Sequence, residues 1–357
     1  MKKLKANFGD RSYEVLYQKG LINKVGALVK RIKTDNLAVI VSDSFLKKTY
    51  GQKIERSLKA AGFKFTWFLV SSGGEKSLSE VERLYHHFVK YKSSRRSAVI
   101  SLGGGLVQDL SCYASATYKR GLKLVQIPTT LLIQADTNLG GCAVDLPEGK
   151  SLVGAFYQPS LVIQDVELLQ NLPEVIYQDG LAEIIKYAIN ADFFDQLEKD
   201  FDKLLKKNLS TVEKYVYLSN KIKLNLTERD EHDCRDIRIQ IDLGHTFSHA
   251  LETVTGYRLS HGQALAIGLR AAVIMSQKRG LLSVSKRERI EKLLSATNLP
   301  MSVPKTVRFA SLMSHIKTDK KCYDNKLVFV LIKDFGRLIV VDNVTVNEVK
   351  NVLNQLK

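Results

Sequence analysis

The stretch SAVISLGGGLVQD, residues 97–109, joins a largely apolar run to three glycines and the start of a helical pattern. An apolar run without alternation, as in Ser97–Leu102, is typical of a strand buried on both faces in a parallel sheet. The glycines let the backbone approach a pyrophosphate closely, and the helix start offers free N–H groups and a positive dipole end. Gln108 stands where the GxGxxG fingerprint needs its third glycine, so the stretch alone fits a nucleotide site and a plain tight turn about equally well.

Three further runs have the character of buried parallel strands. They are LAVIVSD at 37–43, TWFLV at 66–70 and LKLVQIP at 122–128. Ahead of residue 97, Ser77 and Glu80 have the spacing of a capping box. Apolar residues then recur at helical intervals: Val81, Leu84, Tyr85, Phe88 and Val89. Strands that alternate with helices in this way imply a parallel sheet with crossover helices.

The second half of the chain has a different pattern. After about residue 165 long helical periodicities dominate, with few strand signals before KLVFVLI at 326–332. The join carries the Pro/Gly-rich segment LPEGKSLVGAFYQP at 146–159. A chain of 357 residues exceeds the usual size of one domain. We therefore predict an α/β domain over 1–160 and a mostly α-helical domain over 161–357.

Composition excludes several classes of protein. The formal net charge is +17, but the basic residues are interleaved with acids, as in ERDEHDCRDIR, and no nucleic-acid motif accompanies them. We expect no nucleic-acid partner, and a basic surface that attracts an anionic substrate. No run approaches the roughly 18 apolar residues of a membrane span, and the start lacks the apolar stretch of a secretion signal, so we expect a soluble, cytoplasmic protein. The four cysteines show no CxxC pairing and are expected to be reduced thiols.

Two histidine motifs, DLGHTFSH at 242–249 and SHG at 260–262, suggest a metal site. In DLGHTFSH, an i,i+4 spacing puts His245 and His249 on one helix face. Such pairs often bind zinc, and are as often structural. Glu183, in GLAEIIK, could complete a Glu/His/His set, which leaves one coordination position open. Lys186 lies one turn further on the same face, and a carboxylate beside an ammonium is costly to bury without function or pairing.

Together these motifs resemble those of the 3-dehydroquinate synthases and the wider sugar phosphate cyclase family. The matching pieces follow family order from about residue 35 to 335: LGGGLVQDL, ATYKRG, PTTLLIQADTNLGG, GKSLVGAFYQP, GLAEIIKYAI, LGHTFSHALE, LSHGQALAIG and DKK at 319–321. The resemblance implies an N-terminal Rossmann-like NAD domain, a C-terminal helical metal-binding domain, an active site in the cleft between them, and a homodimer.

The resemblance also implies roles for individual residues. The NAD contacts would be Asp43, Gly104, Gly105, Asp109, Thr129 and Thr130, with Asp136 and Lys150 near the nicotinamide. The ligands of the metal, zinc or alternatively cobalt, would be Glu183, His245 and His261. The substrate contacts would be Lys186 for the hydroxyls, Lys223 and Arg238 for the carboxylate, and Arg120, His249 and one of Lys320 and Lys321 around the phosphate.

The implied reaction converts 3-deoxy-D-arabino-heptulosonate 7-phosphate, a small anionic sugar phosphate, to 3-dehydroquinate and phosphate. NAD oxidises a ring hydroxyl whose oxygen the metal polarises, phosphate leaves, the hydride returns, and an aldol step closes the carbocycle. This places the chain in the shikimate pathway of aromatic amino acid biosynthesis. Two alternatives stay open: a paralogous cyclase or an NAD- and metal-dependent polyol dehydrogenase with another substrate, and a binding protein without catalysis.

Four positions depart from the family pattern. Cys142 follows Gly140-Gly141, where the family has a lysine that contacts phosphate, and the others are Ser151 for Asn, Asp242 for Asn and Gln263 for Glu. An ionised Asp242 beside a phosphate would repel it. The alternative is that a lysine, for example Lys150 or Lys320, compensates Asp242 by pairing with it.

Overall fold

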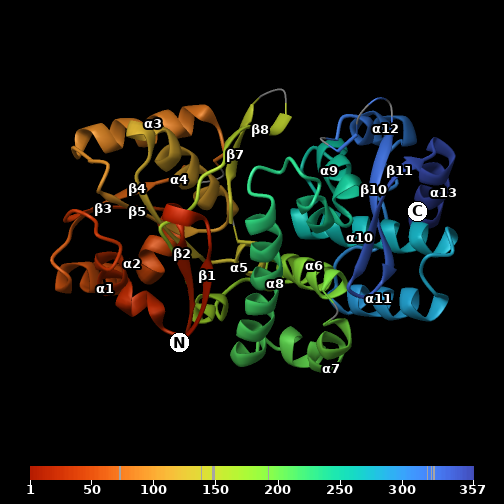
Figure 1. Ribbon diagram of the computed structural model, residues 1–357, viewed down its shortest axis with the longest axis horizontal. Coiled ribbons are helices and arrows are strands. Elements are labelled where there is room, and N and C mark those ends of the chain that lie inside the picture. Colours follow the sequence, from red (N-terminus) through yellow and green to blue (C-terminus); the bar gives the residue numbers. More distant parts are fainter. Residues whose placement is uncertain are drawn as a thin grey trace. The chain divides into compact units, whose positions relative to one another are not determined.

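The computed structural model describes residues 1–71, 74–137, 139–146, 149–191, 193–319, 321–322, 324 and 326–357, and of Gly149 and Lys150 only the backbone (Figure 1). These residues form two compact units. The first comprises Met1–Leu172 with Thr227–His232, and the second comprises Pro173–Leu226 with Asp233–Lys357.

A seven-stranded sheet forms the first unit, in the order β1-β2-β9-β6-β5-β3-β4. Its edge strand β1 is antiparallel to β2, and the other neighbours pair in parallel. The strands are β1 Lys2–Ala6, β2 Tyr13–Tyr17, β3 Leu37–Ser42, β4 Lys64–Leu69, β5 Ala98–Gly103, β6 Lys123–Pro128 and β9 Leu161–Gln164. The four predicted strands are confirmed as β3, β4, β5 and β6 to within about two residues. Because β9 pairs with β6 and β2, the first unit extends past residue 160, where we placed the boundary.

Helices pack on both faces of this sheet, because neighbouring strand residues point to opposite sides. Ile40 and Ile100 belong to a core that includes residues of α1 and α2, whereas Val39 and Val99 belong to a core that includes residues of α3 and α4. The helices are α1 Val25–Lys30, α2 Ser44–Ala60, α3 Leu78–Lys90, α4 Gly105–Thr117 and α5 Leu131–Ala135, with the 3-10 turns η1 Gly9–Arg11, η2 Leu21–Lys24, η3 Tyr118–Arg120 and η4 Val166–Leu169. A hairpin, β7 Cys142–Leu146 with β8 Gly149–Ala155, follows α5.

The start of α3 departs from the expected capping box. Ser77 caps the helix by accepting a hydrogen bond from the N–H of Glu80 at 3.4 Å. The carboxylate of Glu80 accepts instead from the N–H of Ser71 at 3.1 Å and pairs with Arg83. Only the Ser77 half of the prediction is therefore correct. Of the expected apolar face, Val89 is exposed.

The second unit is mostly helical and is built around α10. This helix is buried on nearly every side and packs against α6, α9, α11, α13 and β10, as expected for a helix that is apolar all round. The elements are α6 Glu174–Asn190, α7 Phe194–Leu205, α8 Leu209–Arg229, η5 Arg238–Asp242, α9 His245–Val254, α10 His261–Lys278, α11 Val284–Ala296, α12 Phe309–Lys317, β10 Leu327–Asp334, β11 Arg337–Val344 and α13 Val346–Leu356. Within the described part of the chain, no helix has both the length and the apolar character of a membrane span.

Candidate functional site

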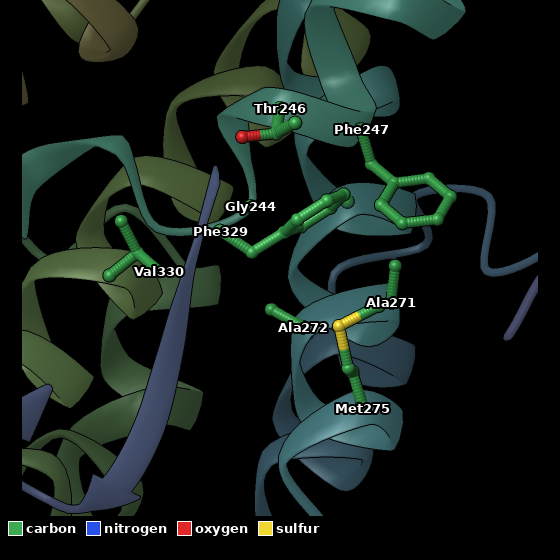
Figure 2. A pocket seen from close by; sticks show the side chains of 9 residues that line it. Gly244, Thr246, Phe247, Ala271, Ala272, Met275, Phe329 and Val330 are labelled. Atoms are coloured by element: carbon green, nitrogen blue, oxygen red, sulfur yellow. The ribbon is translucent and has the colours of Figure 1, made fainter. Parts of the chain in front are cut away.

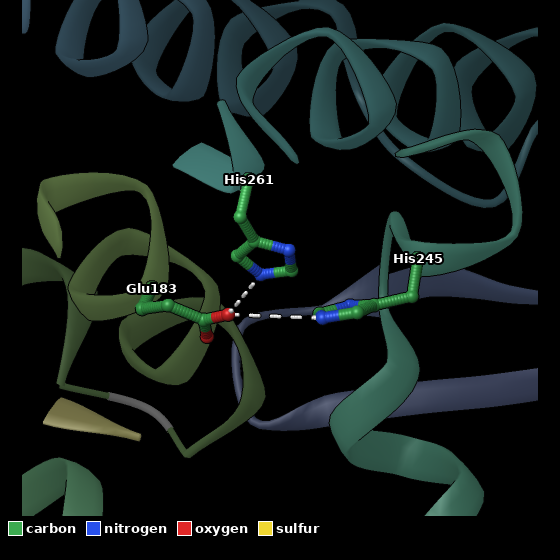
Figure 3. Close-up of side chains that lie close together, drawn as sticks. All are labelled: Glu183, His245 and His261. Atoms are coloured by element: carbon green, nitrogen blue, oxygen red, sulfur yellow. Dashed lines mark hydrogen bonds and ion pairs between the residues drawn. The ribbon is translucent and has the colours of Figure 1, made fainter. Parts of the chain in front are cut away.

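Three side chains of metal-ligand type converge in the second unit (Figure 3). Glu183 comes from the middle of α6, while His245 and His261 are the first residues of α9 and α10. Oε1 of Glu183 lies 3.1 Å from Nε2 of His261 and 3.7 Å from Nε2 of His245. The ligand atoms of all three lie within 4.8 Å of one another, and Glu183 is completely buried. One cation could contact all three.

Glycines hold these three helices at backbone contact. A Cβ on Gly262, directly after His261, would lie 2.3 Å from the carbonyl oxygen of Asp179 on α6. A Cβ on Gly268 would lie 2.3 Å from the carbonyl oxygen of Gly244, which itself has φ +81° and precedes His245. Only glycine permits both approaches, so the glycines set the spacing of α10 from α6 and from the start of α9.

A small hollow lies beside the contact between Gly244 and Gly268 (Figure 2). Its volume is about 10 Å³, which is room for about one water molecule. Its walls are largely apolar: Thr246, Phe247, Ala271, Ala272, Met275, Phe329 and Val330. The hollow is therefore part of the core and is too small to bind a sugar phosphate.

Both imidazoles are oriented through their Nδ1 atoms. Nδ1 of His245 lies 3.2 Å from the carbonyl oxygen of Leu243, which can only accept, and Nδ1 of His261 lies 3.0 Å from Oε1 of Glu252. If each Nδ1 carries the proton, each Nε2 offers its lone pair on the side of Glu183. This is the arrangement in which histidines bind metals, with a second acceptor fixing the ring.

The electrostatics of the cluster favour a cation. Burial, with the charge of Lys186 next in importance, lowers the pKa of His245 well below its usual range, so this imidazole is neutral. Burial alone would lower the pKa of His261 too, but its hydrogen bonds with Glu183 and Glu252 raise it to about 10. Two carboxylates thus stabilise positive charge at this point, and a divalent ion would supply it. The donor set and its electrostatics fit a metal.

Lys186 completes the surroundings of Glu183. Its Nζ lies 2.5 Å from Oε2 of Glu183 and 4.5 Å from the ring centroid of Tyr187, and its side chain is 2% exposed. The glutamate therefore uses one oxygen toward the imidazoles and the other toward the ammonium. This buried charge pair is the one that the spacing in GLAEIIK predicts.

His249 lies outside the three-residue cluster. Its Nδ1 is 3.5 Å from Oδ2 of Asp319, and Oδ1 of Asp319 lies 2.8 Å from Nζ of Lys321. Nζ of Lys321 lies 3.5 Å from Oδ2 of Asp242. Asp242, which departs from the family pattern, is thus paired with Lys321, a lysine that we did not name as its partner. Of the two that we named, Lys320 lies outside the described residues, as does the side chain of Lys150.

The departure at Gln263 has a structural explanation. Its side chain accepts from the N–H of Ser260 at 3.1 Å, and the Ser260 hydroxyl accepts from the N–H of Gln263 at 3.3 Å. This is a capping box at the start of α10, in which Gln serves as well as Glu. Ser260 also donates to Oδ1 of Asp179 at 2.6 Å. The cap therefore fixes the helix turn that carries His261.

In the first unit, several predicted nucleotide contacts share one edge of the sheet. Strands β3, β5 and β6 are neighbours, and their carboxyl ends lead into Asp43, Gly103–Gly105 and Thr129–Thr130. The chain leaves β3 for β4 on one side and returns to β5 on the other. Such a reversal is a topological switch point, where open α/β sheets bind their ligands. The structure thus brings these predicted residues to one edge.

In the glycine turn, Gly103 is packed against its neighbours, whereas Gly104 precedes a helix whose start no described side chain caps. A Cβ on Gly103 would lie 2.4 Å from Cβ of Val107, and the buried Gln108 donates to the carbonyl oxygens of Ser101 and Gly103 at 3.2 and 3.1 Å. Gln108 thus pins the turn to its strand. At Gly104, which precedes α4, no side chain among the described residues caps the helix start. The N–H groups at the start of α4 suit an anion.

The other predicted residues are more dispersed. Asp109 on α4 pairs with Lys76 at 2.9 Å, and Asp136 ends α5. Arg120 is exposed and follows α4, which runs back from the carboxyl end of β5, so Arg120 lies toward the opposite edge of the sheet from Gly104. In the second unit, the buried Lys223 lies on α8 and Arg238 begins η5.

Two side chains of the second unit were missed from the sequence. Glu252 follows His245 by two helical turns, so the spacing in LGHTFSHALE could have placed it on the same face. Asp319 was within the quoted motif DKK, but nothing in the sequence shows that its carboxylate is buried between His249 and Lys321.

Comparison with known proteins decides the family. Two family models match, 3-dehydroquinate synthase N-terminal over residues 67–179 and 3-dehydroquinate synthase C-terminal over residues 180–322. A 3-dehydroquinate synthase of Desulforamulus reducens is 36% identical over 99% of this chain and 99% of its own length. This chain belongs to the 3-dehydroquinate synthase family. The predicted family and the predicted enzyme class, a lyase-type cyclase, are confirmed.

Solved structures of related cyclases confirm the predicted fold for this member of the 3-dehydroquinate synthase family. The 2-epi-5-epi-valiolone synthase of Streptomyces hygroscopicus subsp. jinggangensis, with NAD+ and Zn2+ bound, superposes with a TM-score of 0.86 at 24% identity over 96% of each chain. A 2-deoxy-scyllo-inosose synthase complexed with carbaglucose-6-phosphate, NAD+ and Co2+ superposes with a TM-score of 0.87 at 22% identity over 100% of each chain.

Proposed function

We propose that this chain is a 3-dehydroquinate synthase, which converts 3-deoxy-D-arabino-heptulosonate 7-phosphate to 3-dehydroquinate and phosphate. The observation that carries this proposal is the 36% identity with a 3-dehydroquinate synthase over 99% of both chains. The cyclases of other names among the solved structures are 24% and 22% identical. Lys223 and Arg238 add support, because they match the residues that grip the substrate carboxylate in dehydroquinate synthases.

The proposed metal site consists of Glu183, His245 and His261, and zinc is the proposed ion. The convergence of three ligand atoms, the fixed Nδ1 atoms and the buried carboxylate support it. When bound, such an ion polarises a substrate oxygen and lowers the cost of negative charge that develops on it. The protein's part is to hold the two imidazoles in one tautomer and to keep a coordination position open.

The proposed NAD site lies at the carboxyl edge of β3, β5 and β6. The uncapped start of α4 and the topological switch point support it. When bound, NAD accepts a hydride and returns it within one turnover. The proposed contacts are those that the family resemblance assigns: Asp43, Gly104, Gly105, Asp109, Thr129, Thr130, Asp136 and Lys150.

The chain's own charged groups would hold the substrate. Lys186, fixed by Glu183 and Tyr187, would donate hydrogen bonds to substrate hydroxyls. Its buried stem leaves little rotamer freedom, so its position is set before substrate binds. We propose that His249 serves the phosphate end, since 46% of its side chain is exposed. Following the family we also propose a cytoplasmic homodimer, and sedimentation of the purified protein tests the oligomeric state.

A second candidate is a cyclase of the same family that acts on another sugar phosphate. Two sequence features favour it: Cys142 replaces a lysine that contacts phosphate in the family, and Asp242 adds a negative charge. The pairing of Asp242 with Lys321 at 3.5 Å weakens the second argument, because a paired aspartate repels an anion less. The first proposal therefore stands ahead of the second.

Phosphate release distinguishes these candidates. The purified protein is given NAD, zinc and one of two substrates: the heptulosonate 7-phosphate, or glucose 6-phosphate, which lacks a carboxylate. A 3-dehydroquinate synthase releases phosphate from the first substrate alone, forms dehydroquinate in equal amount and leaves no net NADH. Release from glucose 6-phosphate alone would favour another cyclase, and accumulation of NADH would indicate a dehydrogenase.

A further inference from the structure

Three charged side chains and one imidazole form a row in the second unit. Asp242 ends η5, Lys321 and Asp319 follow α12, and His249 lies on α9. The contacts along the row are 3.5 Å from Asp242 to Lys321, 2.8 Å from Lys321 to Asp319 and 3.5 Å from Asp319 to His249. The row thus joins two neighbouring segments, η5 and α9, to a segment after α12 that is distant in sequence.

The middle of this row is buried. The side chains of Lys321 and Asp319 are 4% and 3% exposed, and that of Asp242 is 14% exposed. Charges out of water are stable only when paired, and removal of one partner leaves the other at a high cost. Lys321 therefore compensates two carboxylates at once.

The backbone around Asp319 fixes its carboxylate. Its Oδ1 accepts from the N–H of Lys321 at 3.0 Å, and its carbonyl oxygen accepts from the N–H of Cys322 at 2.9 Å. Burial alone would raise the pKa of Asp319, but His249 and Lys321 lower it well below its usual range. Asp319 is therefore a fixed anion, with Lys321 on one side and His249 on the other.

We propose that Lys321 is a positioning residue and does not contact the substrate phosphate. It neutralises Asp242 and Asp319 together, and Asp319 in turn orients the half-exposed ring of His249. Through the role of His249 at the phosphate, the inference rests on the proposed function. It explains how this chain accommodates Asp242: the aspartate is a second counter-charge for a buried lysine.

A double-mutant cycle tests the ion pair without any turnover. The four proteins are the wild type, Asp242→Asn, Lys321→Met and the double variant, and the measurement is the thermal unfolding midpoint of the full chain. Lys321→Met should lower the midpoint by roughly 5 °C or more, because two carboxylates each lose a contact with a buried ammonium. Adding Asp242→Asn to Lys321→Met should recover part of that loss, because Asp242 then needs no counter-charge while Asp319 still does. Additive effects of the two changes would overturn the proposal.

Steady-state kinetics of phosphate release tests the positioning role. Lys321→Met should lower kcat while the KM for the heptulosonate phosphate changes less than about threefold, and the double variant should regain part of the kcat. A tenfold rise in KM that Asp242→Asn does not relieve would show that Lys321 contacts the phosphate. Lys317→Met, at the exposed end of α12, is the matched control and should leave both constants unchanged. If the wild type does not turn over this substrate, the proposed function is wrong. The unfolding cycle still shows whether Lys321 and Asp242 form an ion pair.

Discussion

Replacement of Gly262 by Ala should weaken metal binding, because it displaces His261 from the other two ligand-type residues. A Cβ at this position would lie 2.3 Å from the carbonyl oxygen and 2.4 Å from the Cα of Asp179, whereas ordinary contacts of a Cβ begin at 3.4 Å. The obstacle is backbone, which cannot turn aside as a flexible side chain can. The start of α10 must therefore move away from α6 by about 1 Å, and His261 moves with it.

The size of the effect follows from the geometry. Metal–ligand distances must hold to within about 0.2 Å, so a shift of about 1 Å at His261 effectively removes one ligand. We expect zinc affinity to fall at least ~100-fold, which is about 2.7 kcal/mol. The strain should also lower the free energy of unfolding of the metal-free protein by about 1–3 kcal/mol. The better helix propensity of Ala offsets up to ~1 kcal/mol of this loss.

The assay is competition for zinc against a chromogenic chelator, together with denaturant unfolding of the metal-free protein. Gly51→Ala on α2 is the matched control. Its Cβ would meet Lys47 and Trp67 at 3.4 Å, which is ordinary contact, so zinc affinity should not change. If Gly262→Ala binds zinc as tightly as the wild type, the close approach does not position His261 and the reasoning is wrong.

Four further outcomes are expected. Gly104→Val should weaken NAD binding at least ~10-fold by covering the open start of α4, and unchanged affinity by calorimetry would count against this placement of NAD. His261→Ala should abolish tight zinc binding, which stoichiometric zinc in the purified variant would contradict. Ser151 has φ +56°, which Asn tolerates better, so Ser151→Asn should raise the free energy of unfolding by about 0.5 kcal/mol. The hydrogen bond from Lys214 lowers the pKa of Asp200 to about 2, so its stabilisation is complete above about pH 4 and is lost as the pH falls from about 4 to 2. Asp200→Asn should therefore unfold with a shallower acid limb, and an acid limb as steep as that of the wild type would refute this.

Three of the four strands that the sequence predicted in the first unit are buried on both faces. β3, β5 and β6 are continuous apolar runs, because neighbours and helices surround them. By contrast, β1 has the sequence KKLKA and is exposed at the edge of the sheet, so no apolar pattern marks it. The hairpin of β7 and β8 was also missed, since β8 lies in the Pro/Gly-rich segment that we took for the join between the domains.

In the site, too, the sequence indicated some residues and not others. Local motifs singled out Glu183 and the pair His245 and His249, whereas His261 was named as a ligand only through the family resemblance. The partner of Asp242 could not be found in this way, because Lys321 reaches it from a distant turn after α12. Contacts of this kind depend on how helices pack, and a single sequence carries no local signal for them.

The three ligand-type residues lie on three different helices, so no single segment of the unfolded chain can imitate their arrangement. Any ion that binds all three therefore binds the folded chain preferentially. Mass action then links the metal supply to the lifetime of the protein: an ion at 1,000 times its dissociation constant adds about 4.1 kcal/mol to the free energy of unfolding. In a cell short of that ion, more of the chain would therefore be unfolded and open to proteolysis.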